Sequence, residues 1–246
     1  TKARLNSLVA VTVVAGAALA PEPAWGQAAL AGVGATLAAL GACALNQVLE
    51  RERDALMGRT RARPLPAGRL TARAAASLAA GLLVVGCALA AAAGPVPFAL
   101  TALGALLYAL VYTPLKARSP LAFVPGALSG ALPPLVGWTA AGGELDATAA
   151  LLAALLLAWQ TPHVAAIDWV HRDDHRRGGL RTLAVVAPSG RASGAAAVLG
   201  ATTLVAVSAA VGHAFGGLAL GLVTAAVTVP VLRLSVAFAR GRDATA

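Results

Sequence analysis

The stretch ALNQVLERERDALMGRTRARPLPAGRL, residues 44–70, changes abruptly from apolar to charged. It follows a long apolar run, and it sets the acidic residues Glu50, Glu52 and Asp54 beside the basic residues Arg51, Arg53, Arg59, Arg61 and Arg63. The segments around it consist largely of Ala, Leu, Val and Gly. Opposed charges at the end of such a hydrophobic helix predict a polar site where a membrane meets water.

The composition of the chain indicates a protein embedded in a membrane. Of its 246 residues, 59% are hydrophobic and 12% are charged, and the mean hydropathy is +0.77. A soluble domain carries about 25% charged residues, so this chain could not hide its apolar surface in a water-soluble shape. We therefore expect an all-α fold, a polytopic membrane helical bundle.

Eight apolar segments are candidate membrane spans, because a helix needs about 20 apolar residues to cross the hydrocarbon core. They are residues 5–20, 28–49, 74–93, 97–112, 120–141, 147–167, 192–212 and 216–239. Breaks rich in Gly and Pro, such as 94–97 and 141–146, separate them. We predict that all eight belong to a single transmembrane domain, residues 1–246.

The charged residues are distributed asymmetrically over this map. All 19 Lys and Arg residues, from Lys2 to Arg242, fall on one side, whereas the opposite loops carry Glu22, Glu144 and Asp146. The positive-inside rule makes the basic side cytoplasmic, so we expect an inner (plasma) membrane protein whose site faces the cytoplasm. We interpret the net charge of +9 as a feature that sets the orientation of the protein in the membrane and contacts anionic lipids of the bilayer. No nucleic-acid-binding motif accompanies it.

The first polar motif combines an amide with two carboxylates. Asn46, Glu50 and Asp54 stand at i, i+4 and i+8, and a continuous helix would keep them on one face over about 12 Å. Such oxygen-bearing side chains suit Mg²⁺, whose other ligands are often phosphate and water. The alternative is a solvated helix end stabilised by i,i+4 charge pairs.

A second polar motif, WQTPHVAAIDWVHRDDHRRGGLRTL, occupies residues 159–183. It contains His163, Asp168, His171, Asp173, Asp174 and His175, followed by Arg176 and Arg177. By the predicted topology it emerges on the same side as the first motif. Two acidic segments ringed by arginines favour a pocket for Mg²⁺ and diphosphate, since carboxylates hold metal and Arg donates to phosphate oxygens.

Four stretches carry a resemblance to a known family. Residues 46–65 resemble the first signature of the UbiA superfamily of intramembrane prenyltransferases, and their second half resembles its protohaem IX farnesyltransferase branch. Residues 112–138, 159–163 and 172–183 agree with that branch, in order, so the resemblance covers nearly the whole chain. The departures are Glu50 and Glu52 for Asp, His175 for Tyr, and Val164 for Phe. That family has nine helices, and we expect the natural N-terminus and the last helix to lie outside this chain.

The resemblance implies a reaction and a set of site residues. A farnesyl group would pass from farnesyl diphosphate to the vinyl group of haem B, giving haem O and diphosphate. Two Mg²⁺ ions would bind, one at Asn46, Glu50 and Asp54 and the other at Asp173 and Asp174. The side chains expected to contact diphosphate, or in part haem propionates, are Arg59, Arg63, Lys116 and Arg177. His163 would either ligate haem iron or have a structural role.

Two other functions compete with this one. The first is a UbiA-type prenyltransferase that acts on an aromatic or quinone precursor, and the stretches at 59–65 and 159–163 argue against it. The second is a membrane transporter with polar half-helices at its midplane. The charges of this chain cluster at one face instead. The sequence does not indicate an oligomeric state.

Overall fold

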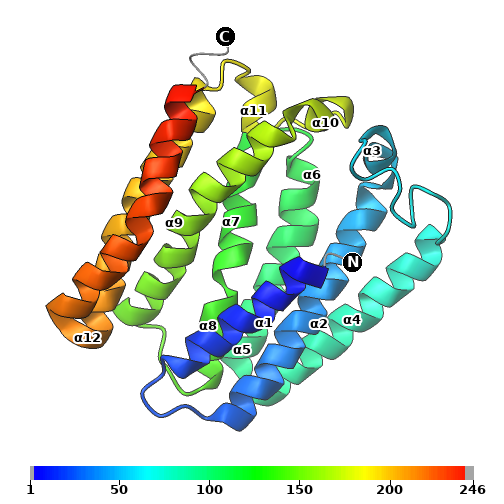
Figure 1. Ribbon diagram of the computed structural model, residues 1–246. Helices are drawn as coiled ribbons and strands as arrows, with labels where there is room; N and C mark the ends of the chain where they lie inside the picture. Colours follow the sequence, from blue (N-terminus) through cyan, green and yellow to red (C-terminus); the bar gives the residue numbers. More distant parts are fainter. Residues whose placement is uncertain (1–2, 242–246) are drawn as a thin grey trace.

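The computed structural model describes residues 3–241, and every regular element in that range is helical (Figure 1). Lys2 and Arg242 of the charge map lie outside the described residues. The elements are α1 (Ala3–Ala18), α2 (Trp25–Leu49), α3 (Arg51–Leu56), α4 (Ala72–Ala93), α5 (Pro95–Leu106), the π-helix η1 (Leu107–Tyr112), α6 (Thr113–Leu115), the 3₁₀-helix η2 (Pro120–Ala122), α7 (Phe123–Ala131), α8 (Pro133–Ala140), α9 (Ala147–Val170), α10 (Arg172–Arg177), α11 (Leu183–Val186) and α12 (Arg191–Gly241). The all-α class predicted from composition is confirmed.

Several of these helices are long and apolar enough to cross a membrane. Six candidates meet that description by length and composition within the described residues, and a shorter apolar helix covers Asn6–Ala18. The candidates are Trp25–Leu49, Ala72–Ala93, Pro95–Leu115, Pro120–Ala140, Ala147–Val170 and Arg191–Gly241. The protein is therefore a multi-pass membrane protein. The count of eight crossings stays a prediction.

The last of these candidates, α12, contains both of the final predicted spans. Its backbone leaves helical geometry at Gly216 and Gly217, where Gly217 has a φ of 72° that favours glycine. The chain reverses there, and the two arms lie side by side (Figure 1). Ser208 on one arm and Thr228 on the other are joined by a hydrogen bond of 3.0 Å between their hydroxyls. This hairpin corresponds to the predicted spans 192–212 and 216–239.

Small residues allow the helices around the site to approach closely. A Cβ atom added to Gly137 of α8 would overlap the backbone carbonyl of Val13 in α1. One added to Gly34 of α2 would lie 2.7 Å from the carbonyl oxygen of Gly86 in α4. Helix association in lipid depends on such contacts, because the lipid tails are as apolar as the side chains.

The polar segments gather at one end of the bundle, where α3, α6, α10 and α11 lie (Figure 1). The first motif does not form the single straight helix that its spacing suggested. Helix α2 ends at Leu49, Glu50 has φ −101° and ψ 6°, and α3 begins at Arg51. The bend keeps both backbone i→i+4 links of the motif, since the Glu50 N–H donates to the Asn46 carbonyl at 3.0 Å and the Asp54 N–H donates to the Glu50 carbonyl at 2.8 Å.

Candidate functional site

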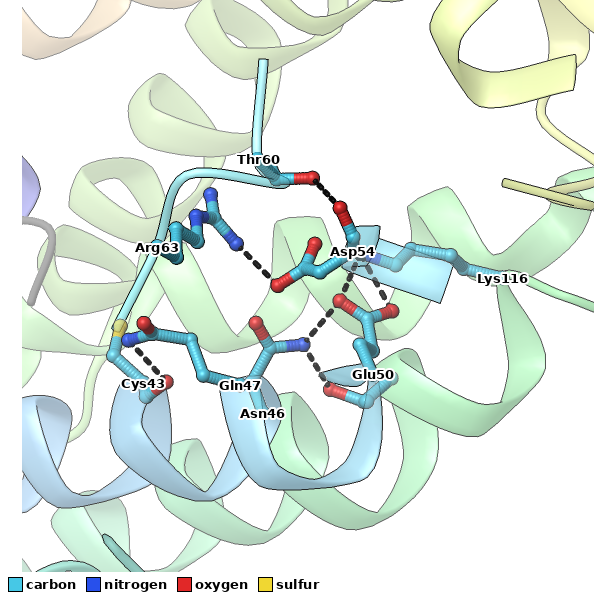
Figure 2. Close-up of polar contacts among 9 residues, drawn as sticks. Cys43, Asn46, Gln47, Glu50, Asp54, Thr60, Arg63 and Lys116 are labelled. Carbon is cyan, nitrogen blue, oxygen red and sulfur yellow. Dashed lines mark hydrogen bonds and ion pairs between the residues drawn. The ribbon is translucent and has the colours of Figure 1, made fainter. Parts of the chain in front are cut away.

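Asn46 and Glu50 form a buried hydrogen-bonded pair at the end of α2 (Figure 2). The amide Nδ2 of Asn46 donates to Glu50 Oε2 at 2.9 Å and to Thr113 Oγ1 at 3.0 Å. Lys116, which follows α6, donates from Nζ to Glu50 Oε2 at 2.9 Å. The first motif is thus joined to a segment more than sixty residues further along the chain.

Asp54 lies next to this pair and has a cation of its own. Arg63 donates from its guanidinium to Asp54 Oδ2 at 2.7 Å, and the Thr60 hydroxyl donates to the Asp54 carbonyl at 2.8 Å (Figure 2). Asp54 and Thr60 are both fully buried. The arginine-rich loop after α3 therefore folds back over the acidic residues that precede it.

The surroundings of Lys116 favour its charged form. Although burial disfavours its charged form, Tyr112, Glu50 and Asp54 act in the opposite direction, and the net effect raises the pKa of Lys116. Its ammonium also lies 5.2 Å from the centroid of the Tyr112 ring, within the range of a cation–π contact.

The cluster contains one buried acceptor that no described residue satisfies. Asn46 Oδ1 is buried and accepts no hydrogen bond from the described residues, whereas Glu50 Oε1 forms an ion pair with Lys116 Nζ at 2.9 Å. In the described range no three His, Cys, Asp or Glu side chains converge as a metal site. Two carboxylates and an amide oxygen nevertheless fit Mg²⁺, which takes few protein ligands and completes its shell with phosphate and water.

The second acidic pair occupies different surroundings. Asp173 is exposed, and its carboxylate lies 3.6 Å from Arg176. Asp174 accepts the backbone N–H groups of Gly58 and Arg59 at 3.1 and 3.0 Å. The Arg59 N–H, followed by that of Gly58, lowers the pKa of Asp174 despite some opposing desolvation. Asp174 therefore ties α10 to the loop of the first motif.

Arg177 belongs to the same acidic end. Its guanidinium lies 3.4 Å from Asp174 Oδ1 and is largely exposed. The predicted meeting of the two polar motifs thus takes place through Asp174 and the Gly58–Arg59 backbone.

Asp168 is a buried carboxylate to which the sequence assigned no role. Its Oδ1 lies 2.8 Å from His175 Nδ1, and its Oδ2 accepts the Ala184 N–H at 2.9 Å. These contacts connect α9, α10 and α11. An acidic residue directly after the predicted span 147–167 was a signal of such a role, because a carboxylate buried at the end of a membrane helix requires partners.

A large cavity lies beside the acidic cluster. It has a volume of about 860 Å³ and is bounded by α1, α2, α5, α7 and α9. Apolar side chains such as Leu100, Leu132, Val136 and Leu156 form much of its wall. Of the predicted site residues, those that line it are Arg59, Lys116 and His163. Glu50 lies behind Lys116, since the lysine contacts both the carboxylate and the cavity.

The histidines of the second motif also reach this cavity. His163 stacks on Trp159, with ring centroids 4.7 Å apart and an angle of 19° between the planes. His171 and His175 line the cavity nearer its polar end. Burial lowers the pKa of His171, and Arg59 and His175 lower it further.

Fold and site together define a class: a multi-pass helical membrane protein whose buried acidic cluster adjoins an apolar cavity. Residues 8–246 match the model of the UbiA prenyltransferase family, and the chain belongs to that family. Among its relatives, a protoheme IX farnesyltransferase of Anaeromyxobacter sp. (strain Fw109-5) is 50% identical over 75% of this chain and 63% of its own length. That of Geobacter sulfurreducens is 47% identical over 72% of this chain and 66% of its own length. This chain therefore spans less than two thirds of either relative.

Solved structures share the fold at low sequence identity. A UbiA homolog from Archaeoglobus fulgidus bound to GPP and Mg²⁺ has a TM-score of 0.70 at 17% identity, over 94% of this chain and 80% of that one. An apo UbiA homolog from Aeropyrum pernix K1 has a TM-score of 0.70 at 21% identity, over 97% of this chain and 94% of that one. This likeness establishes the bundle architecture.

Proposed function

We propose that this chain forms the catalytic centre of an enzyme that transfers a farnesyl group from farnesyl diphosphate to haem B. The observation that carries the proposal is the buried Asn46–Glu50–Asp54 cluster beside an apolar cavity of about 860 Å³. A prenyl diphosphate has the matching chemistry, with a charged head for the polar end and a hydrocarbon tail for the walls. Relatives named protoheme IX farnesyltransferase, 42–50% identical, support haem as the acceptor.

The proposed reaction adds a farnesyl group and a water-derived hydroxyl across the vinyl double bond, whose π electrons form the new carbon–carbon bond. The bond between farnesyl C1 and the diphosphate oxygen breaks, and a bond forms between C1 and the vinyl group of haem B. Water then adds its oxygen to the vinyl carbon left electron-poor and releases a proton. The products are haem O and diphosphate. The difficult step is the departure of diphosphate, because negative charge accumulates on its oxygens.

Asn46, Glu50 and Asp54 would hold Mg²⁺, the ion that their oxygens fit. Bound there, Mg²⁺ would neutralise phosphate oxygens as the C1–O bond breaks. A second Mg²⁺ at Asp173 and Asp174 remains part of the proposal. It would have to compete with the backbone N–H groups that Asp174 already accepts.

Lys116 and the arginines would bind the diphosphate. Lys116 and Arg59 line the cavity and can reach a substrate head from its polar end. Arg63 and Lys116 now neutralise Asp54 and Glu50, and we propose that they turn to phosphate oxygens when the metal takes the carboxylates. Arg177 would contribute from α10.

His163 is proposed to contact the haem. It lies on the wall of the cavity, stacked on Trp159. A neutral imidazole is a good axial iron ligand, and an indole beside it could pack against a macrocycle. In this proposal the haem would lie against α9 and the diphosphate at the Lys116 end.

We further propose that the polar end faces the cytoplasm across the inner membrane. Single cysteines in place of Arg61 and Arg176, both exposed, should react with a membrane-impermeant maleimide only after the inner membrane is opened. The unsubstituted protein, which retains Cys43 and Cys87, is the control. Labelling from the periplasmic side of intact spheroplasts would show that the polar end faces the periplasm and would refute the proposed orientation.

Pigment extraction tests the function as a whole. Membranes expressing the protein with haem B and farnesyl diphosphate should yield haem O, identified by chromatography and mass, and the Asp54→Asn variant should yield almost none. The matched Asp173→Asn variant tests the second acidic motif in the same way, so that the haem O yields of the two variants show which motif the reaction requires. Unmodified haem together with a prenylated aromatic compound would point to the rival prenyltransferase function. Absence of any prenylated product would refute the proposal.

A further inference from the structure

The side chain of Thr113 lies between the π-helix η1 and the acidic cluster. It is 2% exposed. Its hydroxyl donates to the Tyr108 carbonyl at 2.8 Å and accepts from Asn46 Nδ2 at 3.0 Å. A π-helical turn is rare and often marks a functional site. Here it delivers a hydroxyl from one helix to an amide on another.

The direction of these hydrogen bonds determines how Asn46 is turned. A hydroxyl has one proton, and that of Thr113 is donated to the Tyr108 carbonyl. The hydroxyl therefore presents a lone pair to Asn46, and the amide must turn its NH₂ group toward it to donate a hydrogen bond. Glu50 imposes the same choice, because its carboxylate oxygen accepts from Nδ2 at 2.9 Å.

The opposite end of the amide is consequently an oriented acceptor. With both Nδ2 protons committed, Asn46 Oδ1 is buried and accepts no hydrogen bond from the described residues. If the amide flipped, its oxygen would face the Thr113 lone pair and the Glu50 carboxylate. Both buried hydrogen bonds that Nδ2 donates would then be lost. An unpaired buried oxygen held in this way suits a hard cation.

We propose that Thr113 is a positioning residue, which locks the Asn46 amide with Oδ1 toward the metal. The inference rests on the proposed function, because it assumes that the first motif binds Mg²⁺. Thr113 itself would contact neither the metal nor the substrates. Residues that orient a ligand in this way typically change metal affinity by about 10- to 100-fold when replaced.

The test compares variants that differ in one hydroxyl. Thr113→Val keeps the shape and removes the hydroxyl, whereas Thr113→Ser restores it. Thr36→Val is the matched control, because the Thr36 hydroxyl donates within its own helix to the Gly32 carbonyl at 2.8 Å. The measurement is Mn²⁺ binding to the purified, detergent-solubilised protein with inorganic pyrophosphate, followed by electron paramagnetic resonance. Mn²⁺ accepts the same oxygen ligands as Mg²⁺.

We expect Thr113→Val to weaken Mn²⁺ binding by about tenfold or more, and Thr113→Ser and Thr36→Val to stay within about twofold of the parent protein. Equal binding by Thr113→Val and the parent would overturn the inference. So would a serine variant as weak as the valine variant, since shape and not the hydroxyl would then matter.

An Asn46→Ala background protects the test against a general folding defect. Alanine leaves no amide to orient, so adding Thr113→Val there should change the remaining Mn²⁺ affinity by less than about twofold. If Thr113→Val weakens Mn²⁺ binding in this background as much as it does in the parent protein, the positioning role is refuted. Asn46→Ala and Asp54→Ala separate the two levels of the argument. If neither weakens Mn²⁺ binding, the proposed metal site itself fails; if both do and Thr113→Val does not, the positioning role alone fails.

Discussion

Replacing Lys116 by Met should destabilise the protein strongly while preserving most of the side chain's length. The Lys116 and Glu50 side chains are 15% and 5% exposed, and the two charges are 2.9 Å apart. Removing one partner of so buried a pair costs about 3–5 kcal/mol, because the other charge is left uncompensated. For a chain of this size that corresponds to a fall in Tm of about 6–20 °C.

The assay is a double-mutant cycle on thermal unfolding in detergent. Glu50→Gln should also destabilise, whereas the double variant should recover most of the loss, since neither charge then remains buried alone. Added Mg²⁺ should raise the Tm of Lys116→Met more than that of Glu50→Gln, which lacks a carboxylate ligand. Single variants that each cost under about 1 kcal/mol and combine additively would show that Lys116 and Glu50 are not a buried pair, because that is how a solvated surface pair behaves.

Three other predictions concern packing, the haem and pH. Gly137→Ala should cost about 1–3 kcal/mol of unfolding free energy by forcing the α1 backbone away, whereas Gly81→Ala, with open space around it, should gain up to about 1 kcal/mol; equal Tm values would contradict the packing. His163→Ala should weaken haem binding and shift the Soret band without changing pyrophosphate binding, and an unaltered haem spectrum would return the histidine to a structural role. Because the Arg59 N–H lowers the pKa of Asp174, the link to that loop should be present above the unfolded carboxyl pKa and lost as pH falls through the lower folded value. Hydrogen exchange at the Arg59 amide should then accelerate in acid relative to its intrinsic rate, and Asp174→Asn should abolish that pH dependence.

Much of the fold and the first motif followed from short-range patterns. Apolar runs predicted the helices because spanning a membrane requires a continuous hydrophobic segment. Helix α9 begins where its sequence predicts, since the Asp146 carboxylate accepts the Ala149 N–H at 2.9 Å as a helix cap. The spacing of Asn46 and Glu50 likewise placed them in contact, and their hydrogen bond is a local i,i+4 interaction.

The partners of those side chains depended on the tertiary structure. Lys116 neutralises Glu50 across 66 positions of the chain, and Asp174 meets the Gly58 N–H across 116. Such pairings follow from which helices are neighbours, and no periodicity in the sequence encodes that. The π-helical turn is a comparable case, because the segment around Tyr108 reads as an ordinary apolar helix.

Composition and local spacing thus predicted an all-helical membrane protein, the family resemblance and the residue types of the site. That Glu50 interrupts its helix, that Asp174 accepts backbone N–H groups, and that Asn46 donates to Thr113 followed only from the packing of the helices. Burial explains the difference. Once the packed helices exclude water, each polar atom must take the partner that the neighbouring helix presents.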